Sequence, residues 1–179
     1  LQRANSRTRS FVLSRSFFIG SSKYGPIWTG DNTASWEHLE STLPMLLSLN
    51  LGGIYWCGAD VGGFFGNPDG ELMVRWYQSA IFQPFFRGHA HIDSKRREPW
   101  VFGDPYSKLI RDAIKLRYKL LPYIYTVFSN AYQNGVPIIR PVWFEFDFNE
   151  SYLDIEDEFF LGYNLLIKPI TKSNNQYTN

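Results

Sequence analysis

The sequence predicts an α/β fold: the C-terminal half of a (β/α)8 TIM barrel that runs into the start of a β-sandwich domain. Short apolar runs typical of strands alternate with helical patterns, which is the order of βα units on a parallel sheet. Polar residues recur near the ends of these runs, at Arg15, Asp31 and Asp60, and active-site residues of βα barrels lie at the carboxyl ends of strands. A complete barrel takes about 250 residues, so the 179 residues here hold about four units.

The first unit follows from its apolar runs and from the residues that end them. Residues 11–18 predict a buried strand, and residues 27–29 predict a second short strand that ends before Asp31. Thr33 or Ser35 is placed to cap the next helix, which carries leucines at three-to-four spacing.

The second unit begins after a glycine pair. Gly52-Gly53 is expected to end the preceding helix, and residues 54–57 predict a third strand that ends near Asp60. A glycine-rich loop follows, and Asp69 is placed to cap a helix over residues 71–81.

The last elements are a long helix and two strands. Asp104-Pro105 offers an N-cap followed by a first-turn proline, and Asn134-Gly135 is a typical helix end. Residues 138–144 predict a fourth strand, and residues 165–169 predict a fifth that begins a separate β domain.

We therefore expect two domains, with residues 1–157 forming the second half of the barrel and residues 158–179 the start of a proximal C-terminal β domain. Hydrophobic residues make up 44% of the chain and charged residues 20%, which is a globular composition. Both termini indicate a piece of a longer protein, because the chain begins without an initiator Met or a secretory signal and stops in a polar tail.

Charge and cysteine content narrow the classes of function. A net charge of +1 argues against a nucleic-acid surface, and the short basic run at 95–97, followed by Glu98, is expected to be a solvated loop. One cysteine, Cys57, excludes an intrachain disulfide. No run is long and apolar enough to predict a membrane span.

Asp31 is the most informative candidate for chemistry. It follows a strand and stands behind Trp28, and the cleavage of sugars needs a proton donor, an aromatic wall and polar groups that hold hydroxyls. The alternative is an Asx turn that leads into a helix, and Asp60 allows the same interpretation. Arg15, within an apolar run, is either a structural ion-pair partner or a clamp for a ligand.

Two further patterns point elsewhere. His89, His91 and Asp93 could hold zinc in a metal-dependent barrel hydrolase, but no second His or Cys pair accompanies them. We therefore expect neither a metal nor a cofactor, and we keep the metal-dependent hydrolase as a distant alternative. A glycosylation sequon at 149–151 only weakly favours a secretory address.

Several segments in order resemble glycoside hydrolase family 31, whose members include retaining α-glucosidases, and the resemblance covers about residues 11–170. It is carried by Trp28-Thr29-Gly30-Asp31-Asn32, Gly58-Ala59-Asp60-Val61-Gly62-Gly63-Phe64, Val74-Arg75-Trp76-Tyr77-Gln78, Pro84-Phe85-Phe86-Arg87-Gly88-His89 and Arg140-Pro141.

The resemblance implies a role for each matching residue. Asp31 matches the general acid/base, which protonates the glycosidic oxygen and then deprotonates the attacking water. The other matches are Arg15 and His89 for binding the sugar hydroxyls, Trp28 and Phe64 for the aromatic walls of the pocket, and Asp60 as orienting support.

The sequence departs from the family pattern at the nucleophile. That residue is an Asp on an earlier strand, in a Trp-x-Asp-Met-Asn type of motif, and no such motif occurs here. We therefore expect hydrolysis of terminal α-linked glucose only from a longer enzyme that contains this chain. The alternative is a catalytically inactive, truncated carbohydrate-binding or interaction fragment.

Finer details resemble the family members of the endoplasmic reticulum that trim N-glycans, notably residues 31–34, 89–93 and 97–100. This resemblance implies an α-glucoside or N-glycan substrate, a non-catalytic β subunit as partner, and a location in the lumen of the endoplasmic reticulum. A lysosomal or secreted location is the alternative.

Overall fold

The computed structural model describes residues 10–146 and 150–173. Three α-helices, seven short strands and four 3-10 turns are described there. In chain order they are η1 (Ser21–Lys23), β1 (Ile27–Trp28), α1 (Trp36–Leu51), β2 (Cys57–Gly58), β3 (Asp60–Val61), α2 (Gly70–Ala80), β4 (Arg87–Gly88), η2 (Pro99–Phe102), α3 (Tyr106–Asn134), β5 (Ile139–Pro141), η3 (Val142–Phe144), η4 (Glu150–Tyr152), β6 (Phe159–Leu161) and β7 (Leu165–Ile167).

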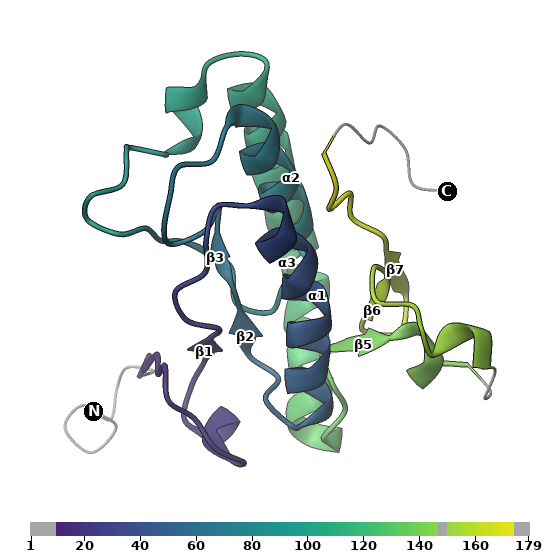
Figure 1. The fold of residues 1–179 in the computed structure, drawn as a ribbon. Helices are drawn as coiled ribbons and strands as arrows, with labels where there is room; N and C mark the ends of the chain where they lie inside the picture. The colour runs from purple at the N-terminus through teal and green to yellow at the C-terminus, as the bar shows by residue number, and fades with distance from the viewer. Residues whose placement is uncertain (1–9, 147–149, 174–179) are drawn as a thin grey trace.

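The strands fall into a parallel part and an antiparallel part. β1 pairs with β2 and β3 pairs with β4, both in parallel, whereas β5, β6 and β7 form an antiparallel sheet. In Figure 1 the parallel strands and the antiparallel sheet lie on opposite sides of the helices, and α1 contacts both β2 and β5. This arrangement agrees with the predicted α/β class.

Two of the predicted helix starts are confirmed. The Ser35 side chain accepts a hydrogen bond from the His38 amide and caps α1, and the Asp69 side chain accepts one from the Leu72 amide and caps α2. The predicted cap of α3 is wrong, because Pro105 takes the N-cap position and no side chain caps the helix. Gly135 ends α3 in the left-handed conformation, as predicted.

Two strand predictions need correction. Of residues 11–18, only Ser14 pairs, in an isolated parallel bridge with Ile27, so the run lies along the edge of β1 and is mostly exposed rather than buried. The strand predicted at 138–144 is only the three residues of β5, and it pairs antiparallel with β6 instead of extending the parallel series. The predicted domain boundary after residue 157 stays a prediction.

The core has two clusters that share α3. One contains apolar residues of α1, β1, β2, β5 and β6, packed on the C-terminal half of α3. The other joins α2 to the N-terminal half of α3, with Trp76 fully buried. Burial of such large side chains supplies most of the driving force for folding.

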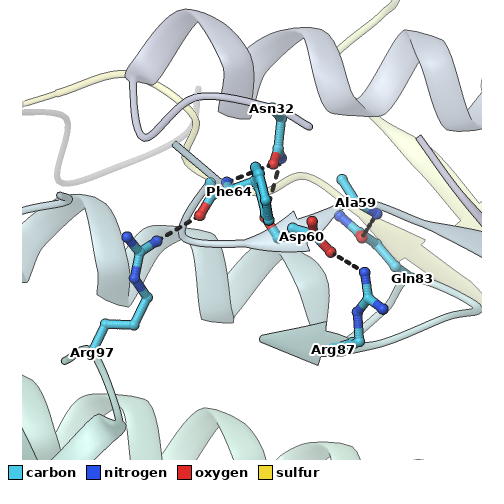
Figure 2. Close-up of polar contacts among 8 residues, drawn as sticks. Asn32, Ala59, Asp60, Phe64, Gln83, Arg87 and Arg97 are labelled. Atoms are coloured by element: carbon cyan, nitrogen blue, oxygen red, sulfur yellow. Dashed lines mark hydrogen bonds and ion pairs between the residues drawn. The ribbon is translucent and has the colours of Figure 1, made fainter. Parts of the chain in front are cut away.

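Arg117 of α3 fixes the loop that leads into β4. Its Nη1 donates hydrogen bonds to the carbonyls of Ile81 (2.6 Å) and Gln83 (2.7 Å), and burial lowers the pKa of this guanidinium to about 10. The Gln83 side chain in turn accepts a hydrogen bond from the Ala59 amide (3.2 Å; Figure 2). The long helix is therefore connected through this loop to the segment between β2 and β3.

Cys57 offers a simple test of this packing. Its thiol is fully buried, and burial raises its pKa to about 12, so almost no thiolate exists at pH 8. We expect iodoacetamide at pH 8 to leave Cys57 unmodified in the native protein and to modify it after unfolding in guanidinium. Peptide mass mapping locates the label; rapid native modification of Cys57 contradicts the packing of β2.

Within residues 10–146 and 150–173, none of the helices combines the length and the apolar composition needed to cross a bilayer.

Candidate active site

The predicted site residues follow neighbouring parallel strands. Asp31 comes three residues after β1, Phe64 three residues after β3, and His89 directly after β4. β1 and the β3–β4 pair belong to separate sheets, and backbone hydrogen bonds join the loops that follow them along one edge. The Phe64 amide donates to the Asn32 carbonyl (2.8 Å), and the His91 amide donates to the Phe64 carbonyl (3.0 Å).

Asp31 and Arg15 lie together at this edge. Arg15 Nη2 is 3.8 Å from Asp31 Oδ2, and the side chains are 62% and 31% exposed, respectively. The expectation of a buried guanidinium is therefore wrong, because the run that carries Arg15 lies at the surface. Of the two alternatives for Arg15, the ion-pair contact is present in the structure, and the role of a ligand clamp stays a prediction; the Asp31 carboxyl is accessible to a ligand.

Trp28 stands on an ion pair whose carboxylate is buried. The Arg87 guanidinium lies 5.1 Å from the centre of the Trp28 ring, a distance at which cation–π attraction operates. Arg87 Nη2 donates to Asp60 Oδ1 at 2.6 Å, and the Asp60 side chain is 1% exposed (Figure 2). Asp60 therefore reaches Trp28 through Arg87.

Asp60 is electrostatically coupled to the other site residues. Burial raises the pKa of its carboxyl, and the hydrogen bond and the charge of Arg87 oppose that rise. Smaller contributions to this pKa come from His89, which lowers it, and from Asp31, which raises it. The charges of His89 and Asp31 thus change the pKa of Asp60, although its side chain is buried.

Phe64 and His89 form a pair of rings. Their centroids are 5.3 Å apart and the planes are tilted by 32°. An aromatic face beside an imidazole can pack on the apolar face of a sugar ring while the imidazole donates to or accepts from its hydroxyls.

Asn32 joins the Asp31 loop to the Phe64 loop, as Figure 2 shows. Its Nδ2 donates to the Asp60 carbonyl at 3.1 Å, and its Oδ1 accepts from the Phe64 amide at 2.9 Å. One amide side chain therefore fixes the segment on both sides of the glycine pair in the β3 loop.

Three residues that organise this site had no role assigned from the sequence patterns. Arg87 and Asn32 stood within the resembling motifs, but nothing in the pattern said which partners they would meet. Arg97 was expected to be solvated with the rest of its basic run, which is wrong: its guanidinium donates to carbonyls of the glycine-rich loop. Arg96 is the exposed member of that run and pairs with Glu98.

His91 and Asp93 of the predicted histidine cluster contact each other and neighbouring aromatic rings. His91 Nδ1 lies 3.5 Å from Asp93 Oδ2, and the His91 ring packs on Phe64 and Phe65. In the part of the chain that the structure describes, no group of three or more His, Cys, Asp or Glu side chains is placed to hold a metal ion. The sequon Asn149 lies outside the described residues.

Comparison with known proteins identifies both parts of the fold. Residues 1–127 match the glycosyl hydrolases family 31 TIM-barrel domain, and residues 135–179 match the glycosyl hydrolase family 31 C-terminal domain. These matches agree with the predicted course from a TIM barrel into a C-terminal domain.

Individual relatives agree with these matches. The chain is 54% identical over 171 residues to neutral alpha-glucosidase C of Mus musculus, covering 96% of this chain and 19% of that protein. It is 56% identical over 169 residues to neutral alpha-glucosidase AB of Dictyostelium discoideum, covering 94% and 18%. The chain therefore spans about a fifth of the length of these relatives.

A solved structure matches the fold as well. It is the endoplasmic-reticulum glucosidase II heterodimeric complex of the catalytic subunit and the binding domain of the regulatory subunit, with a TM-score of 0.91 and 52% identity. The match covers 93% of this chain and 18% of that one.

Proposed function

Since the chain belongs to glycosyl hydrolase family 31, we propose that it forms the acid/base half of the active site of a retaining α-glucosidase. The observation that carries the proposal is the meeting of Asp31 with Arg15 at the loop edge that also presents Phe64 and His89. The reaction is the hydrolysis of terminal α-linked glucose from glycans or oligosaccharides.

In this proposal Asp31 is the general acid/base. Its carboxyl protonates the glycosidic oxygen as the sugar leaves, and its carboxylate then takes a proton from the water that attacks the glycosyl intermediate. Its exposed side chain, 31% accessible, can reach both molecules.

The other residues bind and orient the glucosyl ring. Arg15 and His89 hold hydroxyl groups, and Trp28 and Phe64 form aromatic walls. Asp60 is supporting, because its contact with Trp28 runs through Arg87. These roles use the residue types that sugar recognition requires: charged or imidazole donors for hydroxyls and π-faces for C–H groups.

The second carboxylate of the reaction is absent from the 179 residues, which contain no Trp-x-Asp-Met-Asn type of motif. Retaining hydrolysis needs a nucleophile about 5–5.5 Å from the acid/base. The activity therefore belongs to a polypeptide that contains this chain together with the nucleophile, and the chain by itself is inactive.

A finer proposal concerns the substrate and the setting of the enzyme. The likeness to the glucosidase II catalytic subunit, which was solved with a regulatory-subunit domain, supports trimming of glucose from N-glycans in the lumen of the endoplasmic reticulum with a β subunit. Purification of the native enzyme tests this: a stoichiometric second subunit is expected, and a catalytic chain that purifies alone contradicts the partner.

The main test isolates the native polypeptide that carries this sequence and sequences peptides upstream of Leu1. We expect a much larger chain that contains the nucleophile motif and releases α-glucose from an α-1,3-linked disaccharide, with the anomer identified by NMR. Release of β-glucose, or no hydrolysis by such a chain, contradicts the proposal. A native chain near 20.9 kDa that binds glucose without cleaving it would favour the alternative of a binding fragment.

A further inference from the structure

Arg97 makes an unusual set of contacts for a residue in a basic run. Its Nη1 donates to the carbonyls of Gly62 (3.1 Å) and Gly63 (2.5 Å), and its Nη2 donates to the carbonyl of Gly66 (2.5 Å). Among the described residues it forms no ion pair with a carboxylate, and burial lowers the pKa of its guanidinium. Figure 2 shows the side chain reaching from its own loop to the loop of Phe64. The charge is therefore used to bind backbone carbonyls.

The glycine part of the loop that Arg97 binds is held by backbone hydrogen bonds and by Arg97. Gly63 has a φ of +80°, and a β-carbon there would lie 2.3 Å from the backbone nitrogen of Ala34, so this part of the loop carries no side chain that could anchor it. On its other side the Asn32 carbonyl accepts from the amides of Phe64 (2.8 Å) and Phe65 (2.9 Å). The loop is held between Asn32 and Arg97.

Arg97 also belongs to the segment that carries His89. Within that segment the His91 amide donates to the Phe64 carbonyl (3.0 Å), and the Lys95 amide donates to Asn67 Oδ1 (2.8 Å). These hydrogen bonds join the two loops, and the Arg97 guanidinium adds its contacts at the far end of the same interface. The two loops joined in this way also carry the Phe64 and His89 rings, whose centroids are 5.3 Å apart.

We propose that Arg97 is a positioning residue, which holds the Phe64 loop against the His89 loop and thereby sets the width of the sugar pocket. The role in the pocket rests on the proposed function, whereas the role as a brace rests on the contacts alone. Arginine suits this position because its planar fork reaches three carbonyls at once, whereas a lysine ammonium presents its donors from a single atom and can replace only part of these contacts.

Hydrogen exchange tests the brace without any need for activity. In the full-length polypeptide we compare Arg97→Met with Arg96→Met, which removes the neighbouring exposed arginine that pairs with Glu98. We expect the amides of residues 64–66 to exchange about tenfold faster or more in Arg97→Met, since hydrogen bonds to charged groups are among the stronger ones. Equal exchange in the two variants overturns the proposal.

Kinetics on a small α-glucoside test the effect on the pocket. Arg97→Met is expected to raise KM about tenfold with a smaller change in kcat, and Arg97→Lys, which guards against a folding defect, is expected to recover part of the loss. A variant that only lowers the folded fraction reduces kcat and leaves KM unchanged.

A double-mutant cycle with Phe64→Ala separates the route of the effect. If Arg97 acts through the Phe64 wall, its removal changes KM far less in the Phe64→Ala background than in the wild type. Full additivity, or a wild-type KM in Arg97→Met, overturns the pocket role. A full-length wild-type polypeptide without any α-glucosidase activity contradicts the proposed function instead. The hydrogen-exchange experiment still tests whether Arg97 holds the Phe64 loop.

Discussion

Replacing Asp31 by Asn in the full-length polypeptide is expected to lower turnover of a natural α-linked disaccharide by about 10²–10⁴-fold. An amide cannot deliver a proton to the leaving oxygen, so the glycosidic bond must break without protonation. The fold should be unaffected, because the Asp31 side chain is partly exposed and its contact with Arg15 is long, at 3.8 Å. The measurement is kcat/KM together with the thermal unfolding midpoint of both proteins.

The nature of the leaving group sharpens this test. For an aryl glucoside whose phenolate leaves without protonation, kcat/KM should fall much less in Asp31→Asn than it does for the disaccharide, since the first step then needs no acid, whereas kcat still falls because the second step loses its base. Asp93→Asn is the matched control, because its carboxylate is 87% exposed and makes only a 3.5 Å contact with His91. Near-normal cleavage of the disaccharide by Asp31→Asn would remove Asp31 from the acid/base role.

Replacing Arg87 by Met is expected to destabilise the protein by about 3–5 kcal/mol, the usual cost of removing one partner of a buried ion pair. The substitution leaves the Asp60 carboxylate buried without its 2.6 Å partner and removes the cation behind the Trp28 ring. The double variant Asp60→Leu/Arg87→Met removes both charges, so it should recover most of the stability but not the affinity for substrate. If the double variant is less stable than Arg87→Met, the unpaired Asp60 carboxylate is not the source of the lost stability, which contradicts the prediction.

The loss in Arg87→Met depends on pH in a defined direction. Burial raises the folded-state pKa of Asp60 above its ordinary value of 3.8. The favourable contribution of Asp60 to the free energy of unfolding is therefore fully present below pH 3.8, where the carboxyl is protonated, and is lost as the pH rises through the folded-state pKa. Without Arg87, which lowers this pKa, the loss extends over a wider pH range. The difference in unfolding free energy between wild type and Arg87→Met should therefore shrink as the pH falls from 7 towards 4.

Local signals predicted helices better than strands. Ser35 and Asp69 cap their helices as expected, because the cap and the apolar spacing lie within a few consecutive residues. Strand signals mislead at 11–18, where an apolar run makes only one bridge, and at β5, whose partner β6 lies about twenty residues further along the chain. A strand is defined by a distant neighbour that its own sequence does not contain.

The candidate site divides in the same way. Asp31, Phe64 and His89 were predicted from motifs and lie on loops at one strand edge, and their individual roles stay proposals. The residues that hold them could not be read from pattern, because Arg97 and Arg96 are chemically identical neighbours in the sequence. Only the fold brings one onto the carbonyls of a glycine loop and leaves the other on the surface.

Asn50 has a consequence for recombining enzymes of this family. It lies buried in α1, and its Oδ1 accepts hydrogen bonds from the amides of Ile138 and Ile139 at 3.2 Å each. One side chain of α1 therefore satisfies two backbone amides at the start of the antiparallel sheet. A chimaera spliced near Gly135 takes this acceptor from one parent and the two amides from the other. Any parent without proline at 138 or 139 supplies the two amides, so this contact constrains the α1 donor, which must carry an amide acceptor at position 50.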